Sequence, residues 1–315
     1  MARAPIIVVA IALAASAGLT GGAAGPAQVT EKAGERLVTV PVTVHPHNDR
    51  ARQMASDLRA DAFAVREDDR EQLVISVDGP DKTPVILALL IQDDLISQVN
   101  LELDRLRRFI RSLPQGSRVM TGYLTVGDVT VTQAFTPDLA AAAASLRILR
   151  GRSAAPFNPY VGVVNILRRF GEQPAGRRVV LMVSDGLDIS RGFSPESVLR
   201  SIDLERAISE AQRLGVAVFG VYAPSTGLTS VSRFAANYGQ AALNRLADET
   251  GGLGFQSGFT FVTFDPYLRE FRTLLGRMWL LSYRTTSTSS GFRKIKVTTP
   301  LDLHIHYPAG YRAQR

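Results

Sequence analysis

The sequence predicts an α/β fold, a doubly wound and mostly parallel sheet, together with a small β module formed by the N- and C-terminal segments. Three largely apolar runs, at residues 85–91, 178–184 and 216–222, are typical of strands covered on both faces. Segments with helical periodicity separate these runs, as the crossover helices of a parallel sheet do. The pattern at both ends of the chain is β-like instead, which predicts the separate module.

The composition is that of a folded globular protein. The chain has 315 residues, 45% of them hydrophobic and 21% charged, which is enough for one large domain or two modest ones. The formal net charge of +7 is spread along the chain without basic blocks, so the sequence predicts no nucleic-acid partner. The lack of cysteine excludes disulfides, thiolate metal sites and a cysteine nucleophile.

Residues 1–27 are predicted to be a signal peptide. A short positive region, Met1–Arg3, precedes the apolar segment Pro5–Ala14, and small residues follow. This apolar segment is shorter than the roughly 20 residues that span a bilayer, which favours cleavage between Ala17 and Ala27 over an uncleaved membrane anchor. No later segment is apolar enough to span. We therefore expect an exported protein, periplasmic or extracellular, with no integral membrane segment after cleavage.

The β module is expected to combine residues 36–80 with residues 288–314. Residues 37–44 alternate as a half-buried strand does, and a second strand is expected at residues 72–77. Near the other end of the chain, β patterns recur at residues 279–284, 292–298 and 301–307. All three segments are expected to complete the β module, although the range assigned to the α/β domain extends to residue 284 and so includes the first of them.

The α/β domain is expected at residues 84–284 and is Rossmann-like in its alternation of strands and helices. A helical stripe covers residues 99–113 and ends at Pro114. Two short strands, at residues 118–124 and 129–135, share a turn. Apolar spacing and capping residues predict further helices at residues 138–149, 160–170, 204–214, 240–250 and 265–277.

Two carboxylates directly follow predicted buried strands. Asp93 comes after the first apolar run, and Asp185 comes after the second. Open α/β sheets bind ligands beyond the carboxyl ends of their strands, so both residues are candidates for a functional site. A simple strand-end turn with a solvated aspartate accounts equally well for Asp185, and the polar residues Gln92 and Asp94 have the same ambiguity.

These segments resemble a von Willebrand factor A (vWA) domain. The resemblance rests on Ile86–Ser97 (ILALLIQDDLIS), on the helix after it, and on Leu181–Asp188 (LMVSDGLD). The flanks are similar to exported bacterial VWFA-related proteins of the acidobacterial type, through residues 42–44, 57–68, 247–252 and 310–312. The resemblance extends from Leu37 to Tyr311, which is nearly the whole chain after the predicted signal peptide.

The resemblance implies a metal-ion-dependent adhesion site. Such sites hold Mg²⁺, which prefers oxygen ligands, through Asp-x-Ser-x-Ser, a threonine and a later aspartate. The corresponding positions are Asp93, Ser97, Asp185 and, in the threonine loop, Asn158. Leu95 replaces the central serine, so the implied site is degenerate. Either Mg²⁺ binds weakly, with Asp94 or water as a substitute ligand, or the site is free of metal.

The four histidines occur as two pairs, His45 with His47 and His304 with His306. Residues two apart on a strand share a face, so each pair could present two imidazoles together. If the terminal strands pair with each other, the four imidazoles could bind Zn²⁺ or Cu²⁺. The alternative, favoured by the turn residue Pro46, is that the histidines are exposed and bind no metal.

The expected function is an exported adhesion or assembly module that binds a partner protein at the degenerate site. Enzyme signatures are absent, namely Gly-x-Ser-x-Gly, a phosphate-binding loop ending in Lys-Ser/Thr, and His-Glu-x-x-His. We therefore expect no enzyme, no catalytic residue, and no cofactor apart from weakly bound Mg²⁺. The alternatives are an envelope hydrolase that uses Asp93 and Asp185 as a metal or acid/base pair, and a metal-free structural component of the envelope.

Overall fold

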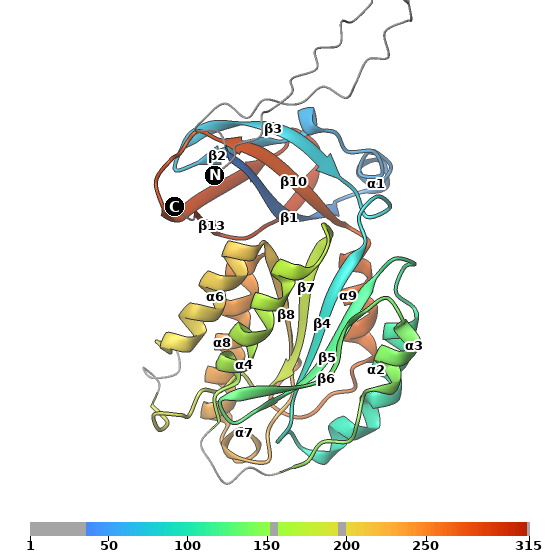
Figure 1. The fold of residues 1–315 in the computed structure, drawn as a ribbon, viewed down its shortest axis with the longest axis vertical. Coiled ribbons are helices and arrows are strands. Elements are labelled where there is room, and N and C mark those ends of the chain that lie inside the picture. Colours follow the sequence, from blue (N-terminus) through green and yellow to red (C-terminus); the bar gives the residue numbers. More distant parts are fainter. Residues whose placement is uncertain (1–35, 152–156, 195–199, 314–315) are drawn as a thin grey trace, which may run out of the picture. The chain divides into compact units, whose positions relative to one another are not determined.

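The computed structural model describes residues 36–151, 157–194 and 200–313, which belong to one compact unit. The predicted signal peptide lies outside the described residues. Figure 1 shows two sheets, one flanked by helices and one antiparallel, and this confirms the predicted fold class. Within the described residues, no helix combines the length and the apolar character needed to cross a membrane.

The helix-flanked sheet has six strands in the order β6-β5-β4-β7-β8-β9. All neighbouring strands are parallel except β6, which runs antiparallel to β5. Every residue of the central strand β4 and of β8 is buried, as their continuous apolar runs predict. The strands are β4 (Val85–Gln92), β5 (Arg118–Thr125), β6 (Asp128–Thr136), β7 (Arg177–Ser184), β8 (Val216–Tyr222) and β9 (Gly254–Phe255).

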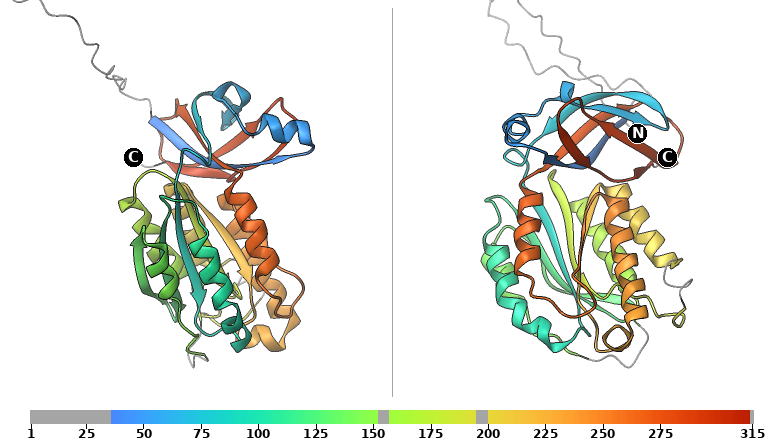
Figure 2. Two further views of the ribbon diagram at one scale, coloured as in Figure 1. Left: turned by 90° about the vertical axis from the view of Figure 1, so that its right-hand side faces the viewer. Right: turned by 180° about the vertical axis from the view of Figure 1, so that it is seen from behind.

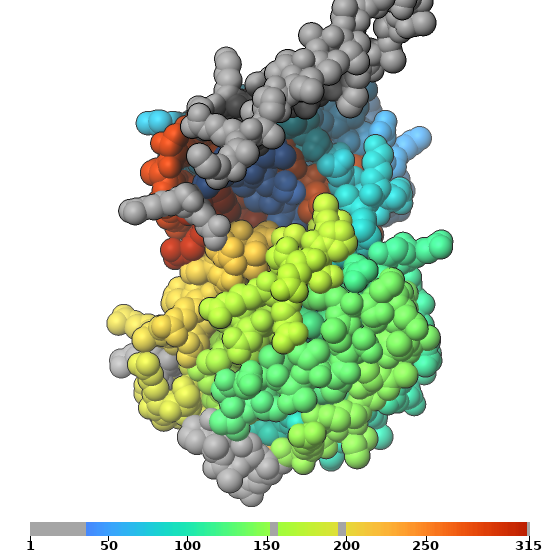
Figure 3. All heavy atoms as spheres, in the orientation of Figure 1, coloured from blue at the N-terminus to red at the C-terminus, as the bar shows by residue number. Residues whose placement is uncertain are grey.

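Helices cover both faces of this sheet because successive side chains of each strand point to opposite sides. On one face, odd-numbered residues of β4 pack with α2 (Leu103–Arg111), α3 (Leu139–Ala144) and α9 (Asp265–Leu275). On the other, even-numbered residues pack with α4 (Pro159–Leu167), α6 (Ile202–Leu214) and α8 (Arg233–Thr250). Figure 2 shows both helix layers. In Figure 3 the side chains of α4 and α6, which contact each other, close over the sheet.

The antiparallel sheet has seven strands in the order β12-β1-β10-β3-β2-β11-β13, so both terminal segments contribute to it. Its alternating side chains form a separate core that includes Val40, Val65 and Ile295. The small helix α1 (Asp49–Met54) and the 3₁₀ helix η1 (Ala60–Ala62) follow β1. The strands are β1 (Arg36–Pro46), β2 (Ala64–Glu67), β3 (Arg70–Asp78), β10 (Met278–Thr285), β11 (Gly291–Thr298), β12 (Leu303–His306) and β13 (Gly310–Ala313).

Strand β10 corrects the expected end of the α/β domain at residue 284. It lies between β1 and β3 and pairs antiparallel with both. The α/β domain therefore ends with α9, the helix that precedes β10 in the chain. The physical reason is the β-type alternation of this segment, which suits a sheet with one core-facing side. The expected module therefore gains a central strand from the range 84–284.

Several helices differ in length from the predicted ones. The stripe at residues 99–113 divides into the 3₁₀ helix η2 (Ser97–Glu102) and α2, and the segment at 160–170 divides into α4 and the 3₁₀ helix η3 (Arg168–Glu172). Asp138 caps α3, accepting a hydrogen bond from the backbone N–H of Ala141 at 2.9 Å, but α3 ends at Ala144 and not at residue 149. Helix α8 begins earlier than predicted, at Arg233, and the short helix α7 (Leu228–Val231) precedes it.

Candidate functional site

The carboxyl ends of β4, β7 and β8 lie side by side at one edge of the six-stranded sheet, and we call this region the carboxyl edge. Gln92 is the last residue of β4 and Ser184 is the last residue of β7. The residues that follow, Asp93, Asp94 and Asp185, are all buried. Because open α/β sheets bind ligands at this edge, the buried carboxylates make it the candidate site.

Asp93 forms a two-pronged ion pair with Arg147. The two terminal nitrogens of Arg147 donate to the two carboxylate oxygens of Asp93, at 2.9 and 2.8 Å. The backbone N–H of Arg150 donates to the same carboxylate at 2.9 Å. Burial alone would raise the pKa of Asp93, but the hydrogen bonds from Arg147 and Arg150 outweigh it and hold the pKa below its ordinary value. Asp93 is therefore a fixed, neutralised anion.

Tyr123, in β5, holds Arg147 in this position. The guanidinium carbon of Arg147 lies 3.8 Å from the centre of the Tyr123 ring, a cation–π contact. The Tyr123 hydroxyl donates to the carbonyl oxygen of Arg147 at 2.6 Å and accepts from its N–H at 2.8 Å. Strand β5 and the segment after α3 thus supply a cation to the carboxyl end of β4.

Gln92 connects the two other carboxylates. Its amide nitrogen donates to Asp94 at 2.8 Å, while its amide oxygen accepts from the Ser184 hydroxyl at 2.5 Å and from the N–H of Asp185 at 3.1 Å. The Thr229 hydroxyl, on α7, donates to Asp185 at 3.0 Å. In this cluster Asp94 and Asp185 receive hydrogen bonds from neutral groups, not from an arginine.

In these neutral surroundings the pKa values of both carboxyl groups are raised. Burial, and after it the nearby charge of Asp185, raise the pKa of Asp94 to about 6. Burial likewise raises the pKa of Asp185, against the opposing effect of hydrogen bonds from the N–H of Leu187 and from the hydroxyls of Ser225 and Thr229. The two carboxyl groups therefore bind protons more tightly than free aspartates do.

The structure gives the four predicted metal ligands different partners. Asp93 pairs with Arg147, and Asp185 belongs to the cluster around Gln92. Ser97 is exposed at the start of η2. Asn158 caps α4: its side-chain oxygen accepts from the N–H of Tyr160 at 3.0 Å, and its amide nitrogen donates to Asp203 at 2.9 Å.

These residues do not fit a bound Mg²⁺ ion. Both carboxylate oxygens of Asp93 accept from arginine, the oxygen of Asn158 accepts from the first turn of its own helix, and Leu95 is buried without a side-chain oxygen. Mg²⁺ requires near-octahedral oxygen ligands, and these are already engaged. Within residues 36–151, 157–194 and 200–313, no group of three or more His, Asp or Glu side chains could hold a metal ion.

The sequence did not indicate that Arg147 pairs with Asp93, that Gln92 bridges the ends of β4 and β7, or that Thr229 contacts Asp185. The partners of these contacts are 54, 92 and 44 residues apart in the chain, respectively. Because the only residue-level signals were strand ends and motif spacing, nothing indicated which distant side chain reaches which carboxylate. The ambiguity noted for Gln92 and Asp94 was the one useful hint, and the structure resolves it in favour of buried roles.

Three large apolar side chains are exposed close in sequence to Arg147 or Thr229, and we call them the apolar rim: Ile148, Val231 and Phe234. Their exposed fractions are 70%, 83% and 52%. Ile148 follows the arginine that pairs with Asp93, and Val231 lies on α7 with the threonine that contacts Asp185. Phe234 packs against Tyr238, with ring centres 4.8 Å apart.

The histidine pairs meet only in part. His45 and His304 are opposite each other on β1 and β12, with ring centres 5.9 Å apart. The Nε2 atom of His306 lies 2.6 Å from the carbonyl oxygen of Gly252, a hydrogen bond that engages that ring nitrogen. His47 is exposed. Burial, followed by the nearby His304, Arg277 and His306, lowers the pKa of His45.

No family model matches the sequence, and no curated protein matches it. Among solved structures, BatB from Bacteroides thetaiotaomicron is similar with a TM-score of 0.44 and 15% identity over 61% of this chain and 97% of that one. A von Willebrand factor type A protein from Catenulispora acidiphila gives 0.42 and 10% identity, over 81% and 75% of the chains. The vWF domain of the type V pili tip protein Mfa5 from Porphyromonas gingivalis gives 0.42 and 11%, over 61% and 94%. These are similarities of fold alone.

Proposed function

We propose that this chain is an exported adhesion or assembly module that binds a partner protein at the carboxyl edge without a metal ion. The observation that carries the proposal is the pairing of Asp93 with Arg147. In a metal-ion-dependent adhesion site a bound cation neutralises the carboxylate at this position, and here an arginine of the chain itself does so. The partner would then be held by protein contacts alone.

The apolar rim supplies the contacts that such an interface needs. Protein interfaces are enriched in aromatic side chains at their centre and surround them with polar groups. Phe234, Val231 and Ile148 are exposed, and they lie close in sequence to residues that contact the buried carboxylates. Covering a large apolar side chain fully is worth about 1.5–3 kcal/mol, which offsets part of the cost of association.

The hydrolase alternative is weakened by the same ion pair. Asp93 cannot serve as a general base or as a metal ligand while Arg147 engages both of its oxygens. Asp94 and Asp185 have raised pKa values, which suits acid–base chemistry. Both are buried and both form hydrogen bonds with Gln92, so we assign them the structural role of joining the ends of β4 and β7.

The experiment is capture of a partner from envelope extract by the immobilised chain, in the presence of either Mg²⁺ or EDTA. We expect equal capture in both, and loss of capture by the double variant Val231→Ser with Phe234→Ser. A matched control is Leu73→Ser, because Leu73 is 62% exposed on β3 of the other sheet. Capture that requires Mg²⁺, or that survives the rim substitutions, would refute the proposal. Catalytic turnover abolished by Asp185→Asn would favour the hydrolase.

Export is proposed separately, on the N-terminal sequence. N-terminal sequencing of the protein from its native cells tests it, with a mature terminus expected between residues 18 and 28. An intact Met1 on a cytosolic protein would contradict export while leaving the binding proposal open to its own test.

A further inference from the structure

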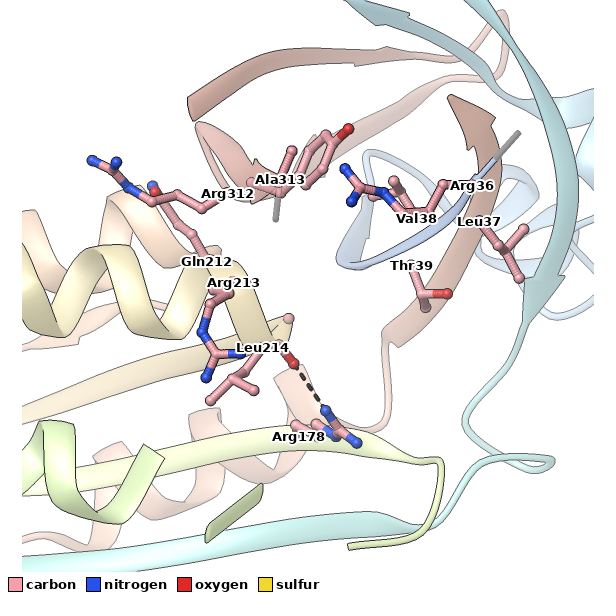
Figure 4. A pocket seen from close by; sticks show the side chains of 12 residues that line it. Arg36, Leu37, Val38, Thr39, Arg178, Gln212, Arg213, Leu214, Arg312 and Ala313 are labelled. Atoms are coloured by element: carbon pink, nitrogen blue, oxygen red, sulfur yellow. Dashed lines mark hydrogen bonds between the residues drawn. The ribbon is translucent and has the colours of Figure 1, made fainter. Parts of the chain in front are cut away.

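The first strand of the β module has chemically different surroundings at its two ends. The first residues of β1 line a hollow of about 330 Å³, where the guanidinium of Arg178 donates to the carbonyl oxygen of Leu214 at 3.1 Å (Figure 4). In the described part of the chain, no histidine lines this hollow. Near its other end β1 carries His45, to which the proposed function gives no role. A guanidinium repels a metal cation, whereas a neutral imidazole binds one, so a cation site belongs at this second end.

His45 and His304 form a cross-strand pair. They are directly opposite each other where β1 and β12 run antiparallel, and opposite residues of such strands project from the same face of the sheet. Four consecutive residue pairs fix this register. Just beyond them, the side-chain amide nitrogen of Asn48 donates to the carboxylate of Asp302 at 2.5 Å. The backbones of the two strands therefore hold the two imidazoles side by side.

The separation of the two rings suits a shared metal ion. Their centres are 5.9 Å apart, and their planes are inclined at 48°. A ring nitrogen binds a metal ion at about 2.0 Å, which places the ring centre about 3 Å from the metal. Two rings that share one ion therefore have centres at most about 6 Å apart, a limit that this pair satisfies. His304 is exposed, so rotation of its side chain can bring the rings closer together.

The ring nitrogens of the pair are available as ligands. Among the described residues, neither ring forms a hydrogen bond, whereas Nε2 of the nearby His306 bonds to the carbonyl oxygen of Gly252. Burial, and after it the nearby His304 and Arg277, lower the pKa of His45. Protons compete with metal ions for the imidazole lone pair, so a lowered pKa favours the metal-binding form at neutral pH. The charge of Arg277 also repels a bound cation, which limits the affinity.

Two imidazoles leave most positions around a metal ion open. Within residues 36–151, 157–194 and 200–313, no third His, Asp or Glu side chain joins the pair in a group that could hold a metal ion. Zn²⁺ in proteins usually has three or four protein ligands. Cu²⁺ binds a given set of ligands more tightly than the other divalent ions of its row, and it accepts a tetragonal arrangement of nitrogen and oxygen. The pair therefore favours Cu²⁺ over Zn²⁺.

We propose that His45 and His304 together bind one Cu²⁺ ion, with water completing its coordination. Strand β12 is the edge strand of the seven-stranded sheet and has only four residues, so the ion would tie this short strand to β1. Both ligands belong to the β module. The proposal therefore does not depend on partner binding at the carboxyl edge.

The test is titration calorimetry of the purified full chain with Cu²⁺ at pH 7.5, in a buffer that does not bind copper. We expect the pair to bind one ion with a Kd of about 10 µM. His304→Ala should weaken this binding roughly tenfold or more, because a single imidazole loses the gain from a second, tethered ligand. His45→Ala should weaken it by a similar factor. The double variant should show little further loss, since both side chains serve the same ion.

The matched control is His47→Ala, which removes an exposed imidazole two residues from His45 and should leave Kd unchanged. Electron paramagnetic resonance of the copper-loaded chain gives an independent readout. We expect hyperfine coupling to two nitrogen atoms in the wild type and to one in His304→Ala. No copper binding by the wild-type chain, an unchanged Kd in His304→Ala, or an equal loss in His47→Ala would overturn the proposal.

Discussion

Asp93 and Asp185 directly follow two adjacent parallel strands, yet their surroundings shift the pKa values of the two carboxyl groups in opposite directions. Asp93 faces a guanidinium, and its pKa is lowered although burial works against this. Asp185 faces hydroxyl and backbone N–H donors, and burial raises its pKa together with that of Asp94. A buried carboxylate is thus kept charged by a cationic partner, whereas neutral donors of similar number only partly offset the loss of water.

The strongest test of this contrast is Arg147→Ala. It leaves Asp93 buried without a cation, and breaking a buried ion pair from one side costs about 3 kcal/mol or more. We expect the free energy of unfolding, measured in urea, to fall by about this amount. The control is Arg52→Ala, since Arg52 and Asp49 form an exposed pair worth well under about 1 kcal/mol. Equal effects of the two variants would mean that the Asp93 pair contributes no more than a surface one.

Gln92→Leu tests the neutral half of the comparison. It removes the amide that links Asp94 to Ser184 and to the N–H of Asp185, and so leaves buried polar groups without partners. Such a loss costs about 2 kcal/mol. Urea unfolding measures it, and Gln133→Leu, at a half-buried position of β6 whose side-chain hydrogen bond is exposed, is the control. A stable Gln92→Leu protein would show that the cluster does not hold the two strands together.

The pH dependence of stability separates the two kinds of carboxylate. Because the folded-state pKa of Asp94, about 6, exceeds its unfolded value, the folded state binds the proton more tightly. The contribution of Asp94 to stability therefore increases as pH falls from about 7 to about 4. Asp93 contributes in the opposite sense, because its lowered pKa gives stability that is lost only at more acidic pH.

Asp94→Asn should therefore raise Tm at pH 7.5 and should have little effect at pH 4. The quantity to measure is the difference in Tm between wild type and variant, because His45 titrates in the same range. The lowered pKa of His45 makes its protonation destabilising, and this effect cancels in the difference. A difference that does not vary with pH would contradict the assigned environment of Asp94.

The smallest expected effect is that of Mg²⁺. Titration calorimetry should detect no Mg²⁺ binding by the wild-type chain, and none by Leu95→Ser combined with Asn158→Thr, because Arg147 still engages both oxygens of Asp93. The informative comparison adds Arg147→Ala to these two substitutions. Tight binding by the wild-type chain would show that the ion pair opens and that the metal site is intact.

Much of the fold could be predicted from local patterns of apolar and polar residues. Largely apolar runs identified β4, β7 and β8 because a strand buried on both faces has few polar positions along its length. The same pattern placed Asp93 and Asp185 at the carboxyl edge. The β module was predicted from its alternation, although the domain boundary at residue 284 cut off a strand that pairs with β1 and β3.

The sequence by itself therefore determined the buried central strands and the edge where the carboxylates gather, since burial and periodicity are properties of neighbouring residues. Only the tertiary structure decided what each carboxylate faces. Arg147 reaches Asp93 across 54 residues, and Thr229 reaches Asp185 across 44, through loops whose course depends on packing of the whole domain. The pKa of a buried group depends on the charge of the atoms touching it, and those atoms come from distant segments.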